Sequence, residues 1–211
     1  MNAPCIWITG LPCSGKTTVA ARLSALLEEE GIDHEVLDGD EVRKGLSRGA
    51  GFSKEERNRH NERVSYVANL LTKHGILTII CLISPYREAR DRGREIIGEP
   101  FRLVYLDCPP AECMKRDVKG MWAKAVRGEI KEFTGVSDPY EEPTPGERHL
   151  RILTETTSPD EAATMLFEKL IKPPAADVLL RHPCAQTNFP YRMSLLEKCQ
   201  WEEIVEREAQ D

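Results

Sequence analysis

The residues best suited to chemistry form a phosphate-loop pattern close to the N-terminus. Residues 10–17 match the pattern G-x-x-x-x-G-K-[ST]. The apolar run at 5–8 predicts a buried strand before the loop, and the apolar spacing over 18–30 predicts a helix after it. Backbone N–H groups of such a loop, next to a helix N-terminus, form a cradle for phosphate oxygens. The candidate residues for binding a nucleoside triphosphate are Gly10, Leu11, Pro12, Cys13, Ser14, Gly15, Lys16, Thr17 and Thr18.

Two side chains of this loop have separate expected roles. Lys16 suits the β- and γ-phosphates, and the Thr17 hydroxyl suits Mg²⁺. The pattern therefore predicts ATP or a related triphosphate, with Mg²⁺, as the cofactors of the protein.

Two carboxylates and an arginine follow the second predicted strand, at 34–37. Asp38 and Asp40 come at the carboxyl end of this strand and face the phosphate loop, where they suit a general base or a ligand of Mg²⁺-bound water. Arg43, one helical turn further on, suits an anionic acceptor. The alternative for Asp40 is to cap the helix that follows.

Strand and helix signals alternate along most of the chain, as a fold that positions these residues requires. Further strands are predicted at 77–83, 101–106 and 149–153, and further helices at 53–74, 87–97, 110–116 and 158–170. This order predicts an α/β fold of the P-loop NTPase type, with a parallel sheet and helices on both faces. Ligands of such sheets collect at the carboxyl ends of the strands.

Two regions interrupt the alternation. Residues 117–147 carry four basic side chains among glycines and prolines with no strand pattern, which predicts either a basic lid or a disordered segment. From residue 172 a proline-containing tail follows, with a short amphipathic helix predicted at 194–208. We therefore expect one domain at 1–171 and a partly helical C-terminal extension at 172–211, which packs on the domain or on a second subunit or has a regulatory role.

Composition narrows the class of protein further. The 211 residues carry a net charge of −6, which argues against a general nucleic-acid binder. No apolar run could span a membrane, and no secretion leader is recognisable, so we expect a cytoplasmic protein with a small-molecule partner. Seven scattered cysteines predict reduced thiols. Cys13 lies at a helix N-terminus, where thiol pKa values fall, and is either a redox residue or a loop filler.

Several motifs together resemble the adenylylsulfate (APS) kinase family over residues 3–170. They are the phosphate loop, Leu-Asp-Gly-Asp-x-Val-Arg at 37–43, Gly-Phe-Ser-Lys-Glu-Glu-Arg at 51–57, Ile-Ser-Pro-Tyr-Arg at 83–87, Arg-Asp-Val-Lys-Gly at 116–120 and the stretch 128–141 ending in Asp-Pro-Tyr-Glu. The resemblance implies transfer of the γ-phosphoryl group of ATP to the 3′-hydroxyl of APS, as in sulfate assimilation. It also implies a lid that closes over both nucleotides, and a homodimer.

The resemblance assigns roles residue by residue. Asp38 would orient or deprotonate the attacking hydroxyl and, with Thr17, hold Mg²⁺, while Lys16 and Lys119 would stabilise charge on the moving phosphoryl group. Arg116 would lie near the ATP base, and Phe52 and Phe133 would stack on the acceptor base, although a core role is the alternative for Phe52. The acceptor-binding set is Asp40, Arg43, Phe52, Arg57, His60, Ile83, Ser84, Lys119, Glu132 and Phe133.

Two departures from the family pattern fall on the acceptor side. His60 stands where the family usually has Asn, and Glu132 stands where it usually has Gly. They keep open a second reading, a kinase of the same fold that acts on another nucleotide conjugate, such as a cytidine diphosphate derivative. A third reading is a non-catalytic nucleotide-binding regulatory module. The lysine, hydroxyl, carboxylate and arginine candidates argue against this third reading. All of them are present together, whereas a module that had lost turnover would be expected to have lost at least one.

Overall fold

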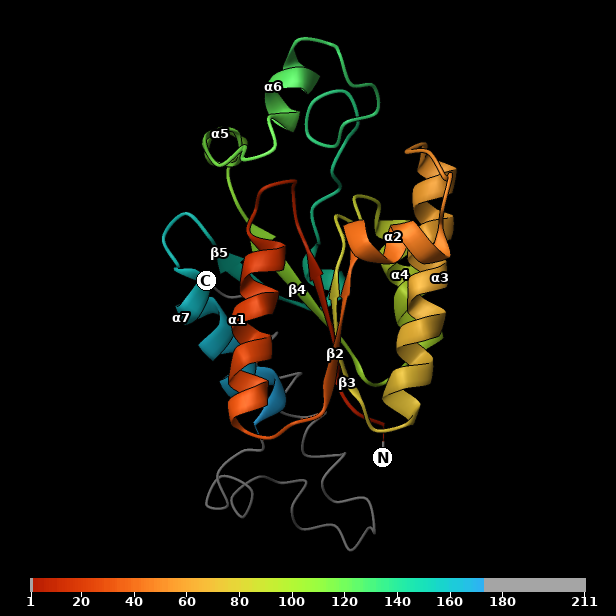
Figure 1. Cartoon of the computed structure of the whole chain (residues 1–211), viewed down its shortest axis with the longest axis vertical. Helices are drawn as coiled ribbons and strands as arrows, with labels where there is room; N and C mark the ends of the chain where they lie inside the picture. Colours follow the sequence, from red (N-terminus) through yellow and green to blue (C-terminus); the bar gives the residue numbers. More distant parts are fainter. Residues whose placement is uncertain (1, 173–211) are drawn as a thin grey trace, which may run out of the picture.

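A five-stranded sheet in the order β2-β3-β1-β4-β5 organises the protein (Figure 1). The structure is a computed structural model that describes residues 2–172, so the predicted C-terminal extension lies almost wholly outside the described residues. The strands are β1 (Cys5–Thr9), β2 (His34–Asp38), β3 (Leu77–Cys81), β4 (Phe101–Asp107) and β5 (His149–Leu153). All four neighbouring pairs are parallel, which confirms the predicted α/β fold.

Helices cover both faces of this sheet (Figure 1). On one face lie α1 (Lys16–Glu29) and α7 (Pro159–Leu166), and on the other α3 (Lys54–Lys73) and α4 (Arg87–Ile97). Side chains of β1 alternate between the two cores: Ile8 packs with the residues of α1 and α7, and Trp7 packs with those of α3. All five residues of β1 are buried, as expected for a central parallel strand.

The helix that follows β2 is capped by Asp38 and not by Asp40. In α2 (Gly39–Leu46) the N-cap is Asp38, whose Oδ1 accepts a hydrogen bond from the Asp40 backbone N–H at 3.0 Å. The interpretation of Asp40 as the cap was therefore wrong, because the last residue of β2 is still extended and aims its own side chain at the helix start. The N-cap of α3 is Ser53, whose side chain accepts a hydrogen bond from the Glu56 N–H.

The basic lid is more ordered than its sequence predicted. After α5 (Pro110–Lys115) comes the short helix α6 (Met121–Val126), which starts where the Asp117 carboxylate accepts from two backbone N–H groups. Trp122 of α6 is buried, and its indole N–H donates to the carbonyl of Pro12 at 3.1 Å. The Trp122 side chain thus helps to fix the lid to the phosphate loop. Its helix was missed because six residues give too little periodicity.

A second set of contacts fixes the later part of the lid to the sheet. The Tyr86 hydroxyl donates to both carboxylate oxygens of Asp138 at 2.8 Å. The Tyr140 hydroxyl lies 3.0 Å from Thr9 Oγ1 at the end of β1. Two short helical turns, Pro145–Glu147 before β5 and Phe167–Ile171 after α7, complete the described chain.

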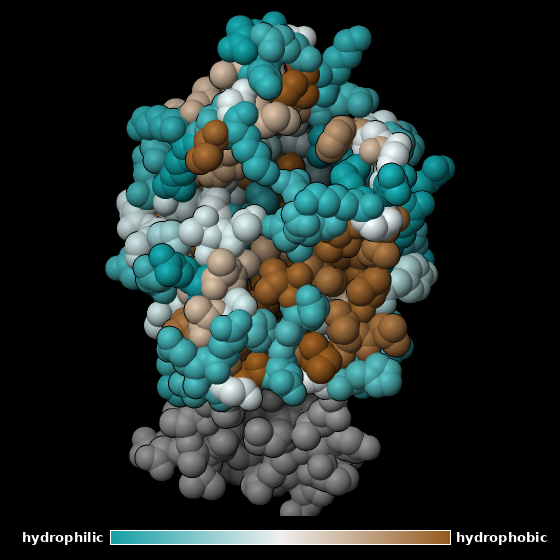
Figure 2. Space-filling model, in the orientation of Figure 1, coloured by the Kyte–Doolittle hydropathy of each residue, from teal (hydrophilic) through white to brown (hydrophobic). Residues whose placement is uncertain are grey.

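An apolar surface lies between α1 and α3, over the edge strand β2 (Figure 2). Among the exposed apolar residues of the neighbouring elements are Leu46 at the end of α2 and Tyr66 and Leu70, four positions apart on α3, which are 41, 55 and 59% exposed. We call these three residues the α3 patch. Exposed apolar residues that gather on one side of a protein mark an interaction surface more often than scattered ones do. None of the described helices is long and apolar enough to cross a membrane.

Candidate active site

A cavity of about 990 Å³ lies at the carboxyl edge of the sheet, between the phosphate loop and the lid. This volume is at the upper end of the range for ligand pockets. Of the site residues predicted from the sequence, all line the cavity except Gly10 and Leu11. The structure therefore brings the triphosphate, acceptor and lid candidates into one space.

Gly10 and Leu11 lie behind the cavity wall and serve the loop itself. A Cβ on Gly10, at φ +150°, would lie 2.6 Å from the Leu106 carbonyl oxygen, so only glycine fits there. The Leu11 side chain packs in the cluster around Trp122. Their contribution to the site is through backbone carbonyls, which accept hydrogen bonds from Lys16 Nζ at 2.9 and 2.7 Å.

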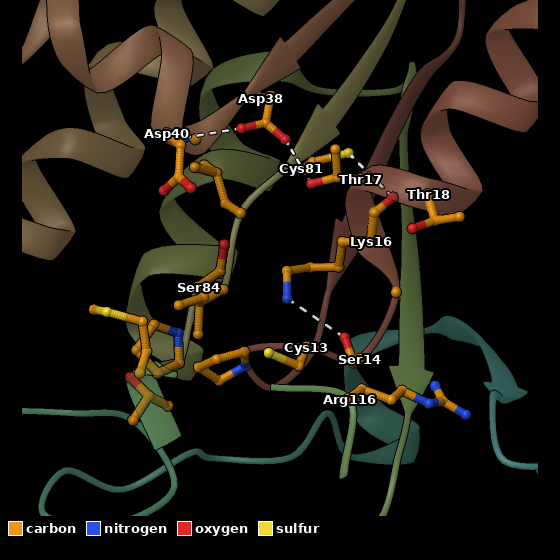
Figure 3. Close-up of a pocket in the computed structure, with 18 of the residues that line it drawn as sticks. Cys13, Ser14, Lys16, Thr17, Thr18, Asp38, Asp40, Cys81, Ser84 and Arg116 are labelled. Carbon is orange, nitrogen blue, oxygen red and sulfur yellow. Dashed lines mark hydrogen bonds between the residues drawn. The ribbon is translucent and has the colours of Figure 1, made fainter. Parts of the chain in front are cut away.

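Lys16 extends across the loop toward Ser14, with Nζ on the cavity side (Figure 3). Burial lowers the pKa of its ammonium group to about 8, partly offset by acidic groups that include Asp38. The group therefore stays mainly protonated at pH 7. A partly desolvated cation among backbone N–H groups is suited to bind phosphate oxygens.

Thr17 and Asp38 place two hard oxygen atoms side by side, as Figure 3 shows. Thr17 Oγ1 donates to Asp38 Oδ2 at 2.7 Å, while Oδ1 of the same carboxylate caps α2. Among residues 2–172 no group of three His, Cys, Asp or Glu side chains could hold a metal ion. A hydroxyl and one carboxylate nevertheless fit Mg²⁺, which takes few protein ligands and completes its shell with phosphates and water.

The acceptor half of the cavity is built around an exposed aromatic ring. Phe52 is 53% exposed, so it is not a core residue. The guanidinium carbons of Arg43 and Arg57 lie 4.7 and 5.4 Å from its ring centroid. Part of each guanidinium is already engaged: Arg43 donates to the Gly51 carbonyl, and Arg57 donates to the carbonyls of Phe52 and Glu132. Arg57 therefore organises the site as well as offering charge to it.

The lid closes the cavity from the opposite side. Lys119 Nζ lies 2.7 Å from Asp40 Oδ2, and this exposed ion pair joins the lid to α2 across the cavity mouth. Phe133 lies edge-on to Trp122 at 5.2 Å between centroids, with one surface on the cavity. Glu132 adopts φ +55°, its side chain is exposed, and the residue lines the cavity.

Two more acceptor candidates come from the segment after β3. Ser84, at φ +44°, accepts a hydrogen bond from the Trp7 indole at 3.0 Å, and the Ile83 carbonyl accepts from Thr9. His60 from α3 is buried, and its Nδ1 lies 2.9 Å from Ser47 Oγ. All three candidates line the cavity.

The triphosphate half contains residues that the sequence interpretation missed. Arg116 donates to the Thr154 carbonyl at 2.7 Å, which ties the end of α5 to the segment after β5. That segment lines the cavity with Thr154, Glu155, Thr156, Thr157, Ser158 and Pro159. Only the position of this segment in the chain could have predicted that it lines the cavity, because the carboxyl end of β5 reaches the same sheet edge as the other strands.

Cys13 does not have the environment predicted for it. Burial and the nearby Asp117 carboxylate raise the pKa of its thiol, and the opposing charges of Lys16 and Lys119 do not compensate. The expectation of a lowered pKa was therefore wrong: the thiol is half-buried beside Trp122 instead of facing open solvent at the helix start. A filler of the loop, at φ +66°, describes it better than a redox residue.

The fold and the arrangement around Lys16 define the protein as a phosphate-loop kinase. The family model described as adenylylsulphate kinase matches residues 2–151. The adenylyl-sulfate kinase of Rippkaea orientalis is 47% identical over 165 residues, which are 78% of this chain and 90% of that protein. The chain belongs to the adenylylsulfate kinase family.

Further relatives agree with this assignment. The probable adenylyl-sulfate kinase of Aeropyrum pernix is 48% identical over 141 residues, which are 65% of this chain and 77% of that protein. The solved structure of APS kinase from Mycobacterium tuberculosis, in complex with AMPPNP and APS, aligns with a TM-score of 0.74 at 38% identity. It covers 79% of this chain, and the alignment spans 96% of that chain.

Proposed function

We propose that the protein transfers the γ-phosphoryl group of ATP to the 3′-hydroxyl of adenosine 5′-phosphosulfate, giving ADP and 3′-phosphoadenosine 5′-phosphosulfate. The observation that carries the proposal is the 2.7 Å contact between Thr17 and Asp38, on the wall of the cavity that also holds the acceptor candidates. Family membership and the relatives' printed activities support the same acceptor.

The proposed reaction needs positioning and charge neutralisation more than covalent chemistry. The loop N–H groups and Lys16 bind the triphosphate, and Asp38 orients the 3′-hydroxyl and accepts its proton. The bond from the γ-phosphorus to the ADP oxygen breaks as the bond to the 3′-oxygen forms. Thr17 and Asp38 would hold Mg²⁺, which would neutralise part of the phosphate charge. Lys119, released from Asp40, is then free to follow the moving phosphoryl group.

The acceptor is tested by an ADP-release assay with ATP, Mg²⁺ and micromolar APS, beside a panel of other nucleotide conjugates that includes cytidine diphosphate derivatives. We expect turnover with APS and none with the other conjugates. Turnover on another conjugate alone would mean that His60 and Glu132 have re-specified the pocket. ATP binding without turnover on any acceptor would favour the regulatory module.

We also propose that the protein forms a homodimer through the α3 patch of Leu46, Tyr66 and Leu70. Leu70→Glu places a charge in this patch and should convert the dimer to a monomer, because burial of an unpaired carboxylate opposes association. Sedimentation equilibrium measures the mass against the 23.9 kDa of one chain. The matched control is Leu153→Glu, at a similarly exposed residue of β5, the opposite edge of the sheet. A monomeric wild-type chain, or equal effects of both variants, would contradict the proposal.

A further inference from the structure

Three buried polar atoms at the acceptor end of the cavity lack a hydrogen-bond partner among residues 2–172. They are His60 Nε2, Asn61 Nδ2 and Thr134 Oγ1, and all three residues line the cavity. Buried polar groups in native proteins are almost always paired, so unpaired groups on a ligand cavity point to the ligand as their partner. His60 is only 3% exposed. The groups around its ring determine whether Nε2 needs a donor or an acceptor as its partner.

The other edge of the His60 ring is held by a hydrogen-bonded chain that starts at Arg63. Arg63 Nη1 donates to Ser47 Oγ at 3.1 Å and to the Leu46 carbonyl at 3.1 Å. Ser47 Oγ in turn lies 2.9 Å from His60 Nδ1. Ser47 is 2% exposed and does not line the cavity, so the Nδ1 edge of the ring faces away from the ligand space and the Nε2 edge remains for it.

The direction of this chain follows from what each group can donate. Arginine has no acceptor, so Ser47 Oγ accepts from Arg63. The Ser47 hydroxyl hydrogen then needs an acceptor, and His60 Nδ1 is the one in reach among the described residues. If Nδ1 carried the hydrogen instead, the buried Ser47 hydroxyl and His60 Nε2 would both be left unpaired. The tautomer with hydrogen on Nε2 leaves a single unpaired group, so it is favoured.

The charge state of the ring agrees with this geometry. Burial, with further contributions from the positive charges of Arg43 and Arg63, lowers the pKa of His60 to about 4. The ring is therefore neutral at pH 7, and its Nε2–H is a donor without a charge.

We propose that Ser47 and Arg63 are positioning residues that hold His60 as its Nε2–H tautomer, so that the ring donates a hydrogen bond to an oxygen atom of the acceptor nucleotide. The proposal rests on the proposed function for the identity of that nucleotide. The proposal makes His60, which departs from the family pattern, a hydrogen-bond donor to the acceptor. It makes Ser47 and Arg63, which do not line the cavity, the residues that set this role.

The tautomer is measured without any turnover, by ¹⁵N NMR of the histidine-labelled full chain at pH 7. His60→Gln identifies the His60 signals by their loss, and His149, a half-buried histidine outside the cavity lining, is the internal reference. We expect the Nε2–H tautomer in the wild type and a mixture of both tautomers in Ser47→Ala. An Nδ1–H tautomer in the wild type, or an unchanged tautomer in Ser47→Ala, would overturn the proposal.

Steady-state kinetics test the consequence for binding. Ser47→Ala should raise the KM for APS about fivefold, the effect of weakening one hydrogen bond, with kcat and the KM for ATP unchanged. His60→Gln, which keeps a donor near the Nε2 position, should bind APS better than His60→Leu, which keeps only the bulk. Equal loss in these two variants, or a Ser47→Ala effect on kcat alone, would contradict the donor role.

The two proposals fail separately. Absence of turnover with APS, together with an Nε2–H tautomer that persists only while Ser47 is present, would overturn the acceptor assignment and support the Ser47–His60 chain. Turnover with APS and an Nδ1–H tautomer would do the reverse. In the wild type, the Nε2–H signal should shift when APS is added to the ADP complex, and an unshifted signal would contradict the contact.

Discussion

Asp38→Asn is expected to lower kcat about a thousandfold while ATP still binds, because a general base contributes roughly 10²–10⁴-fold to rate. The amide keeps an oxygen that can accept the Asp40 N–H, so the cap of α2 is retained. The amide loses the charge that faces Thr17, and it could not take up the proton of the acceptor hydroxyl in the proposed reaction. Rapid-quench measurement of ADP formation and calorimetric ATP binding separate the two effects.

A helix-cap variant gives the matched control for this prediction. Asp38→Ala removes the cap as well as the base, and loss of a cap costs about 1 kcal/mol. Ser53→Ala removes the comparable N-cap of α3, and Ser53 does not line the cavity. This variant should therefore lower stability by a similar amount and leave kcat unchanged. If Asp38→Asn retained wild-type kcat, the carboxylate would have no role in the transfer step.

Those parts of the fold that rest on local signals could be predicted from the sequence. The central strands are continuous apolar runs, since both faces of a parallel sheet are covered, and His149–Leu153 and Arg87–Ile97 match their predicted bounds. The loop pattern located Lys16 and Thr17 directly. Position at the end of β2 brought Asp38 to them, because parallel strands end at one edge.

Features that depend on contacts distant in sequence could not be predicted. Trp122 holds the lid against Pro12, 110 residues earlier, and nothing in the spacing of either residue indicates this pair. The same burial raises the pKa of Cys13, whereas helix position alone suggested a fall. Arg57 was predicted only as an acceptor-binding residue, yet its guanidinium also donates to the backbone carbonyl of Glu132 in the lid. In each case folding brings a residue that is distant in sequence into contact, and this contact changes the chemistry of the first residue.

A buried ion pair behind the acceptor half joins two segments that the sequence keeps apart. Arg90 Nε and Nη2 donate to the two carboxylate oxygens of Glu147 at 2.8 and 3.0 Å, and both side chains are 1% exposed. Arg90 Nη1 also donates to the carbonyl of Ser84, at 2.9 Å. The pair therefore holds the acceptor segment after β3 against the turn that precedes β5.

The pH dependence of this pair has a defined sign. Burial acts to raise the pKa of Glu147, but the hydrogen bonds and charge of Arg90 outweigh it, so the folded-state pKa is lowered from 4.5. A carboxyl with a lowered folded pKa stabilises the protein above its unfolded pKa, and this contribution is lost as the pH falls through the folded value. Stability supplied by Glu147 should thus be complete at pH 7 and decline below about pH 4.5.

Glu147→Leu is expected to reduce the free energy of unfolding by about 3–5 kcal/mol, because it leaves the Arg90 guanidinium buried without a counter-charge. The double variant Arg90→Met with Glu147→Leu should recover much of this loss, since apolar groups of similar size can replace a buried pair. Urea unfolding at pH 7 measures both. The matched control is Glu62→Leu, which breaks an exposed ion pair: Glu62 of α3 lies 3.1 Å from Arg92, which is on α4 like Arg90. Loss of this pair should cost under about 1 kcal/mol. Equal losses in Glu147→Leu and Glu62→Leu would mean that burial gives the Arg90 pair no special weight, and that the acceptor segment after β3 is held by its backbone alone.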